Sequence, residues 1–301
     1  KMANGIADDL ISTTLLATPR PIVIAPAMNN GMWKAPATQA NMATLRERGV
    51  HVVGPGSGYL ACGDVDTGRM SEPEDIVEAI CEVLKPVPQY LVGKRVVITA
   101  GPTHEPIDPV RFIGNRSSGK MGIALAGEAA RRGAAVKLVL GPTSLDVPRG
   151  VECVRVQTAA EMLQAALSAF QTADAAICAA AVADYTPATP ADHKLKKANE
   201  RLDRIELVET VDILAELSRQ KGKRCVIGFA AETDNVVEYA ERKLARKGCD
   251  AIIANDVSRA DSGFGTDTNK AWIVSTTGTQ ELPVLTKPQL ADTIVDLLQN
   301  L

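Results

Sequence analysis

The chain has 301 residues, of which 46% are hydrophobic and 23% are charged, and its formal net charge at pH 7 is -3. This composition excludes collagen-like and low-complexity chains, and the negative charge excludes a protein whose overall field attracts nucleic acid or an anionic membrane. No apolar run approaches the ~20 residues of a membrane-spanning helix, and at about 150 residues per domain the length predicts two domains.

Cysteine and histidine spacing argues against a disulfide framework and a structural zinc site. The six cysteines include no C-x-x-C pair, and the three histidines form no ligand-spaced cluster. Widely spaced thiols fit a reducing compartment, so we expect a soluble cytoplasmic protein. The chain begins with Lys1-Met2 and has no signal peptide, so we also expect it to be part of something longer.

Residues 1–84 carry a short alternation of strands and helices. Residues 21–25 and 50–53 predict buried strands, and 38–48 and 73–84 predict helices. Only about three strands are recognisable, whereas a doubly wound sheet normally has five or more. We therefore expect this region to be the C-terminal part of an α/β domain whose N-terminal half is missing.

Two prolines, Pro86 and Pro88, forbid a helix beyond residue 84 and mark a linker at 85–89. We therefore expect domains at 1–88 and 89–301. After the linker, strands alternate with helices to the end of the chain. Mostly parallel strands with helices on both faces predict a Rossmann-like doubly wound sheet, with ligands beyond the carboxyl ends of its strands. The expected strands are 95–100, 136–140, 175–181, 225–230, 251–255 and 272–275, and the expected helices are 119–132, 159–170, 211–219, 236–246 and 289–298.

A polar loop follows the first of these strands and leads into the helix at Gly119. Residues 114–120 satisfy G-x-x-x-x-G-K, but Met121 stands where a P-loop needs Ser or Thr for magnesium, so we reject that interpretation. The loop still presents backbone N–H groups and a helix dipole to an anion. An S-S-G-K helix start alone is more often a cap, but Arg111 and Arg116 beside it favour a phosphate site. Asn115 alone is more typical of a left-handed turn.

The strand expected at 175–181 ends in small residues, Cys178, Ala179 and Ala180, and the chain then reaches Asp184. Small side chains at this end let a ligand approach the backbone, although such runs more often pack under a helix. The carboxylate of Asp184 is harder to assign to a core.

Basic residues occur at Lys194–Lys197 and, four apart on one helix, at Lys243 and Lys247. Charge runs are usually solvated, but an acidic domain that holds a triphosphate needs cations from separate segments. Asp212 fits a helix cap, and Phe229 fits either core or a stacking surface for a base.

Five spaced motifs together resemble a known family, the bifunctional coenzyme A biosynthesis proteins, in which a phosphopantothenoylcysteine decarboxylase is fused to a phosphopantothenate-cysteine ligase. The motifs are I-T-A-G-P-T-x-E-P-I-D-P-V-R (98–111), N-R-S-S-G-K-M-G (115–122), A-A-A-V-A-D-Y (179–185), K-L-K-K (194–197) and G-F-A-A-E-T (228–233). The resemblance implies a ligase that uses CTP and Mg²⁺ to activate the carboxylate of 4'-phosphopantothenate as an acyl-cytidylate, which the amine of L-cysteine then attacks.

The resemblance also implies the roles of individual residues. By this resemblance, Lys194 supports formation of the acyl-cytidylate. Asn115 and Arg111 orient and stabilise this intermediate for aminolysis. The resemblance puts nucleotide contacts on Cys178, Ala179, Ala180, Asp184, Lys194, Val211, Asp212, Ile213, Leu214, Phe229, Lys243 and Lys247. Where relatives have Asn-Pro-Asp, this chain has Thr210-Val211-Asp212, so the loop's rigidity is in question. The ligase half of this family pairs as a dimer, and its substrates are small molecules.

The first region resembles the C-terminal part of the flavodoxin-like, FMN-dependent decarboxylase. By this resemblance Asn29 holds the substrate carboxylate, and Cys62 is the acid that reprotonates the product. The family's flavin-binding front section and its active-site histidine would precede Lys1, so we expect decarboxylation and FMN binding from the full-length parent only. Metal ligands are not assigned.

Two interpretations of other classes remain open. A dinucleotide-dependent reductase would need G-x-G-x-x-G after the first strand, where residues 100–103 read A-G-P-T. A non-catalytic flavoprotein subunit would carry flavin and bind no nucleotide.

Overall fold

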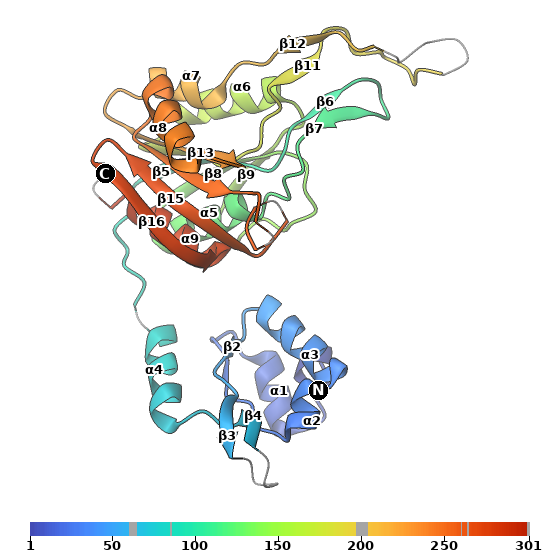
Figure 1. The fold of residues 1–301 in the computed structure, drawn as a ribbon, viewed down its shortest axis with the longest axis vertical. Coiled ribbons are helices and arrows are strands. Elements are labelled where there is room, and N and C mark those ends of the chain that lie inside the picture. Colours follow the sequence, from blue (N-terminus) through green and yellow to red (C-terminus); the bar gives the residue numbers. More distant parts are fainter. Residues whose placement is uncertain (60–64, 85, 197–203, 260, 264, 300–301) are drawn as a thin grey trace. The chain divides into compact units, whose positions relative to one another are not determined.

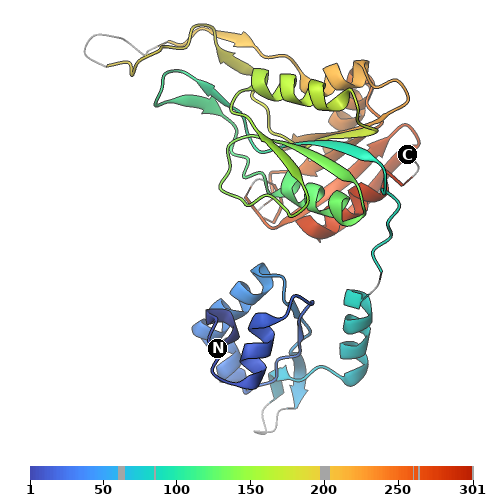
Figure 2. The same cartoon turned by 180° about the vertical axis from the view of Figure 1, so that it is seen from behind.

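The computed structural model describes residues 1–301 except 60–64, 85, 197–203, 260, 264 and 300–301. The chain divides into two compact units, Lys1–Pro86 and Val87–Leu301, and the division falls inside the predicted linker. Figures 1 and 2 show the units from opposite sides, and each is described by itself.

The amino-terminal unit is built mostly of short elements around a small core. Met42, Leu45 and Val50 are buried together with Ala3. One parallel pair, β1–β2, and one antiparallel hairpin, β3–β4, are its sheets among the described residues. The elements are η1 (Met2–Asn4), α1 (Leu10–Ala17), β1 (Val23–Ile24), α2 (Asn30–Lys34), α3 (Pro36–Glu47), β2 (His51–Val52), β3 (Gly56–Tyr59), β4 (Val65–Arg69) and α4 (Pro73–Leu84).

The second unit is an α/β domain with a large sheet. Its elements are β5 (Arg95–Ala100), β6 (His104–Pro106), β7 (Phe112–Gly114), α5 (Lys120–Arg131), β8 (Ala135–Leu140), β9 (Glu152–Arg155), α6 (Ala159–Phe170), β10 (Ala175–Cys178), β11 (Tyr185–Pro187), β12 (Leu207–Glu209), α7 (Ile213–Arg219), β13 (Cys225–Glu232), α8 (Val236–Lys247), β14 (Ala251–Asp256), β15 (Thr268–Ser275), β16 (Gly278–Thr286) and α9 (Lys287–Asp296).

The eight-stranded sheet has the order β16-β15-β14-β13-β10-β5-β8-β9. The six strands from β9 to β14 are parallel, and β15 and β16 add antiparallel pairs at one edge. The chain starts the sheet at β5, builds outward through β8 and β9, and then returns to β10 on the other side of β5. Ligands of doubly wound sheets bind where the order reverses in this way, at the carboxyl ends of the strands. Here that point lies between β5 and β10.

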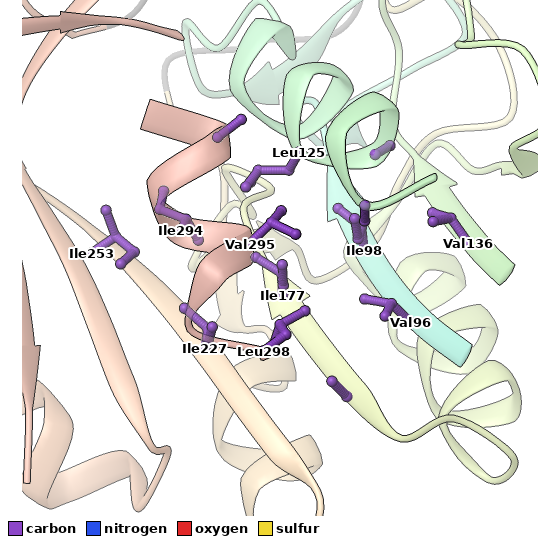
Figure 3. Packing of buried hydrophobic residues seen from close by; sticks show 14 of the residues in the cluster. Val96, Ile98, Leu125, Val136, Ile177, Ile227, Ile253, Ile294, Val295 and Leu298 are labelled. Carbon is purple, nitrogen blue, oxygen red and sulfur yellow. The ribbon is translucent and has the colours of Figure 1, made fainter. Parts of the chain in front are cut away.

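Each central strand is buried on both faces. On one face Ile98, Val136 and Ile177 pack against α5 and α9 through Leu125 and Val295, as Figure 3 shows. On the other face a second buried cluster joins the sheet to α6, α7 and α8. Near-continuous apolar runs are typical of such two-sided burial, which is why the sequence predicts these strands well.

Two antiparallel ribbons, β6–β7 and β11–β12, were not predicted from the sequence. They lie side by side and project from the sheet (Figures 1 and 2). We call the described residues of 104–114 and 185–209, which contain these four strands and the segments that connect them, the arm. The arm also shortens a predicted strand: the expected strand 175–181 ends at Cys178 because the chain leaves the sheet there.

Gly122 lets α5 approach β5 closely. A Cβ atom on Gly122 would lie 2.2 Å from the Ala100 Cβ and 3.0 Å from its Cα, so Gly122→Ala must push the helix away. We expect Gly122→Ala to lower the free energy of unfolding by about 1–3 kcal/mol. Gly127 of the same helix is the matched control, because its Cβ would meet only Pro148 at 3.6 Å. Gly127→Ala should be neutral or stabilising by up to about 1 kcal/mol. Thermal unfolding of both variants tests this, and equal effects would contradict it.

Candidate functional site

A cavity of about 670 Å³ opens at the carboxyl edge of the sheet, where β5, β10, β13, β14 and β15 meet the first turns of α5, α7 and α9. Most of the nucleotide contacts expected from the sequence lie in it. From the predicted set it is lined by Asn115, Cys178, Ala179, Ala180, Asp184, Val211, Asp212, Ile213, Leu214, Phe229, Lys243 and Lys247.

Asn115 joins two loops at the mouth of the cavity. Its Nδ2 amide donates to the carbonyl oxygens of Ala181, at 3.2 Å, and Val182, at 3.0 Å. The left-handed turn that its residue type favours is not found, because within the described residues the one non-glycine with positive φ is Asn235. Asn115 therefore fixes the segment after β10 against the loop before α5.

The first turn of α5 faces the cavity with unused backbone donors. Gly119 occupies the N-cap in the left-handed region at φ 83°, and no side chain of the described residues caps the helix. The first helical bond runs from the Ile123 N–H to the Gly119 carbonyl, which leaves earlier N–H groups for a ligand. An open helix N-terminus at a cavity binds anions such as phosphate.

Asp212, Lys243 and Lys247 form a charged cluster at the α7 and α8 side of the cavity. Asp212 caps α7 by accepting from the Ala215 N–H at 2.8 Å, and it also pairs with Lys247. Burial opposes ionisation, but these hydrogen bonds hold the pKa of Asp212 below its usual value. Lys243 donates to the Phe229 carbonyl at 2.7 Å, and burial lowers the pKa of its ammonium.

Cys178, Ala179 and Ala180 contribute small side chains to the cavity lining. Burial raises the pKa of the Cys178 thiol to about 12, so this thiol stays protonated and is a poor nucleophile. Thr210 holds the neighbouring loop: its hydroxyl donates to the Ala183 carbonyl at 2.6 Å and its N–H to the Asp184 carbonyl at 2.9 Å. These two hydrogen bonds of Thr210 anchor the loop.

Two residues predicted for the ligase site lie outside the cavity lining. Lys194 is exposed between β11 and β12, and Arg111 precedes β7, so both belong to the arm segments. Arg111 donates from Nε to the buried carboxylate of Asp108 at 3.0 Å and from its terminal nitrogen to the Leu195 carbonyl at 3.0 Å. Arg111 therefore ties the Lys194 segment to the first ribbon.

We expect the stability of the arm to depend on pH through Asp108. The Arg111 guanidinium, against the opposing effect of burial, holds the pKa of Asp108 well below its usual range. Its stabilisation is therefore complete above an unfolded pKa of about 3.9 and is lost as the pH falls towards the lower folded value. Asp108→Asn should lower the melting temperature at pH 7, and the difference from the unsubstituted protein should shrink towards pH 3. Asp146→Asn, at an exposed carboxylate, is the control, and a difference independent of pH would contradict the assignment.

Of the two residues predicted for the decarboxylase site, Asn29 and Cys62, the structure describes only Asn29. Asn29 is exposed and caps α2 through a hydrogen bond from the Gly31 N–H at 2.8 Å. Cys62 lies outside the described residues. The described part of the amino-terminal unit therefore does not assemble a flavin site from these predicted residues.

Several polar residues of the cavity were not assigned from the sequence, among them Lys120, Asn255, Asn269 and Lys287. The S-S-G-K motif contains Lys120. Asn255 is the last residue of the predicted strand 251–255, whereas Asn269 and Lys287 lie before the predicted starts of β15 and α9. In the described ranges no three histidine, cysteine or carboxylate residues gather as a metal site. The cysteines described, at 81, 153, 178, 225 and 249, are free thiols. No helix in the part of the chain that the structure describes has the length and apolar character of a membrane span.

Comparison with known proteins gives matches over the whole chain. A model of the DNA/pantothenate metabolism flavoprotein C-terminal domain matches residues 91–301, and a flavoprotein model matches residues 1–85. The chain is 49% identical to the coenzyme A biosynthesis bifunctional protein CoaBC of Bacillus subtilis (strain 168), over 100% of this chain and 74% of that protein. It is 47% identical to the protein of the same name from Escherichia coli (strain K12), over 98% of this chain and 73% of that protein.

Among solved structures, the C-terminal domain of a coenzyme A biosynthesis bifunctional protein CoaBC superposes with a TM-score of 0.60 at 45% identity. That match covers 70% of this chain and 96% of the solved chain.

Proposed function

Because this chain belongs to the family of coenzyme A biosynthesis bifunctional proteins, we propose that its second unit is a CTP-dependent phosphopantothenate-cysteine ligase. The substrates would be 4'-phosphopantothenate, L-cysteine and the magnesium complex of CTP. The observation that carries the proposal is one cavity in which an open helix N-terminus, a paired aspartate and four lysines meet at the reversal of the strand order. Within this proposal the sheet is Rossmann-like, which its strand order supports.

The chemistry needs charge neutralisation more than a nucleophilic side chain. A carboxylate oxygen of phosphopantothenate attacks the α-phosphorus of CTP, the bond to the bridging oxygen breaks, and pyrophosphate leaves with the electron pair. The cysteine amine then attacks the acyl carbon, CMP leaves with the electrons of the carbon–oxygen bond, and the nitrogen releases a proton. The backbone N–H groups at the start of α5 are placed to bind phosphate oxygens during these steps.

The nucleoside would lie at the α7 and α8 side. Phe229 offers a ring, and Asp212 and Lys247, held by each other, offer hydrogen-bonding groups of fixed orientation. Asn115 would position the acyl-cytidylate indirectly, since it holds the loop that ends at Asp184. Lys194 would act on the phosphates once the arm reaches a cavity.

A second copy of the chain would bring the arm to the cavity in a ligase dimer. The arm exposes several large apolar side chains, which is typical of surfaces that pair. They are Val110, Phe112, Tyr185, Leu207 and Val208, each between 43% and 59% exposed. We also propose a cytoplasmic location for this metabolic enzyme.

Magnesium would arrive with the triphosphate, as part of the substrate. The flavoprotein match over residues 1–85 supports FMN-dependent decarboxylation by the complete protein, with Asn29 and Cys62 in the roles expected above. FMN would supply the redox chemistry of that reaction, but the described residues do not assemble its site, and we derive no step through it.

The test is turnover of the purified chain with 4'-phosphopantothenate, L-cysteine and MgCTP. We expect equal amounts of pyrophosphate and CMP, and without cysteine pyrophosphate should form in a stoichiometric burst while CMP release stops. ATP and GTP in place of CTP measure the base preference. Absence of nucleotide-dependent pyrophosphate release would refute the proposal.

A further inference from the structure

We propose that Lys120 and Lys287 form a separate pyrophosphate subsite, which holds the terminal phosphates of the nucleotide and the pyrophosphate that leaves. The inference rests on the proposed ligase function and adds to it a binding site for the leaving group. It begins from the position of these two lysines in the fold.

Lys120 and Lys287 are the first residues of α5 and α9. Helix α5 follows the β5 strand, and α9 follows β16, which is antiparallel to β15 and therefore ends at the carboxyl edge of β14. Both helices pack on the same face of the sheet (Figure 3). Two positive helix ends and two ammonium groups thus gather at one end of the cavity.

Lys287 is a buried cation whose hydrogen bonds, among the described residues, go to neutral groups, although the charge of Asp267 lies near enough to oppose the fall of its pKa. It is 6% exposed, and within the described residues its Nζ donates to the carbonyls of Gly263 and Thr266 and to the Thr266 hydroxyl. Burial and then the nearby Lys120 lower the pKa of its ammonium. A buried ammonium with only neutral acceptors is stabilised by an anion that enters the cavity beside it.

The ammonium group of Lys120 binds the carboxylate of Asp267, in the position where we propose that a phosphate of the ligand binds. Its Nζ pairs with Asp267 at 2.6 Å and donates to the Gly265 carbonyl at 3.3 Å. The Asp267 side chain is 86% exposed, so the pair can open at little cost. Asp267 therefore competes with an incoming phosphate for the same ammonium.

Asn255 adds an amide group to the lining of the cavity. It lies near the end of β14 and is only 8% exposed. Asn269 lines the same region and accepts from the Gly263 N–H at 3.1 Å, which leaves its NH₂ group as a donor.

The two lysine groups lie on opposite faces of the sheet. Lys243 belongs to α8, which packs on the α6, α7 and α8 face, whereas Lys120 and Lys287 begin helices of the other face. A nucleotide that crosses the edge would place its nucleoside on one side and its terminal phosphates on the other. When the bond from the α-phosphorus to the bridging oxygen breaks, the electron pair stays on pyrophosphate, where two ammonium groups offset the added charge.

The experiment is isothermal titration calorimetry of the whole chain with two probes, inorganic pyrophosphate and CMP. Lys120→Gln and Lys287→Met should each raise the dissociation constant of pyrophosphate about tenfold, the loss of one charge-assisted contact, and leave that of CMP within about twofold. Asp267→Asn should lower the dissociation constant of pyrophosphate about threefold, because it removes the competitor of Lys120. Since Lys120 is partly exposed and Asp267 largely exposed, both positions report on binding even if Lys287→Met fails to fold.

Lys270→Gln is the matched control. Lys270 is also a mostly buried lysine, with its side chain 17% exposed and paired with Glu281, but it lies outside the cavity lining. The Lys270→Gln substitution should leave the dissociation constants of pyrophosphate and CMP unchanged. Unchanged pyrophosphate binding in Lys120→Gln, or equal losses for pyrophosphate and CMP, would overturn the subsite and leave the ligase proposal standing. If the binding changes are as predicted but the unsubstituted chain shows no turnover, the ligase function is refuted and the subsite stands.

Discussion

Lys194→Gln is expected to reduce pyrophosphate release in the ligase assay by at least about 100-fold, the usual cost of removing a group that stabilises transition-state charge. Lys194 is exposed on the arm, so the substitution removes an ammonium group without opening a hole in a core. Folding should be unaffected, and the thermal unfolding curve of the variant should match that of the unsubstituted chain.

Asn115→Asp should block a different step. A carboxylate at this position loses both donors to the carbonyls of Ala181 and Val182 and repels their oxygens. Pyrophosphate should still form, but the acyl-cytidylate should persist because its aminolysis is misaligned. Quenched-flow separation of the intermediate distinguishes the two variants. Accumulation of the intermediate in neither variant, or in both, would remove the division of roles.

Mixing the two inactive variants tests whether the arm acts on its own chain. If a second copy supplies Lys194, mixed dimers contain one cavity with both an intact Asn115 and an intact Lys194. Turnover should then return to about a quarter of the original rate in an equal mixture, because half the dimers are mixed and each holds one competent site. No recovery, in subunits shown to exchange, would mean that the arm folds onto its own cavity.

Arg132→Ala is expected to cause the largest loss of stability in the second unit. The Arg132 side chain is 6% exposed and joins Glu128 on its own helix to Asp292 and Asp296 of α9 and to Tyr90. Its removal leaves three carboxylates beside one another. We expect a loss of about 3 kcal/mol, the lower end for a broken buried ion pair, because Asp292 and Asp296 are half exposed.

For a domain of this size, that loss lowers the melting temperature by about 6–12 °C. Arg131→Ala is the control, since Arg131 pairs with the same Glu128 and Asp292 but its side chain is 48% exposed. It should cost less than about 1 kcal/mol. Similar shifts for the two variants in differential scanning calorimetry would show that burial of Arg132 is not what matters.

The central strands and the helices of the second unit could be predicted because their apolar residues repeat with the period of the element. β5 and α6 have the bounds expected from the sequence, and the other predicted helices of that unit differ by one or two residues at their ends. β16 was not predicted, because Pro283 within a polar segment argues against a strand. The structure places this proline on the edge strand opposite the irregularity between Lys270 and Trp272, where no backbone N–H is needed.

The arm was missed for another reason. Its strands are three residues long, and their partners come from segments far apart in the chain or across long turns. A pattern of period two is not visible in three residues. Because the arm was not predicted, the sequence could identify Lys194 and Arg111 as candidates but could not show that they lie outside the cavity that Asn115 lines.

Lys287 shows the limit of reasoning from residue type. A lysine before proline at a helix start is usually a solvated side chain, and only the loop that covers it makes it buried. The pairing of Asp212 with Lys247 similarly depends on the packing of α7 beside α8, which no local pattern contains.

If the subsite proposed above binds pyrophosphate, the cavity runs across the edge of the sheet from one helical layer to the other, so the affinity of a ligand should depend on its reach. A phosphate or a nucleoside alone would engage one end. A stretched molecule with an aromatic head and a multiply charged tail would engage both ends, and should therefore bind more tightly than pyrophosphate or CMP alone.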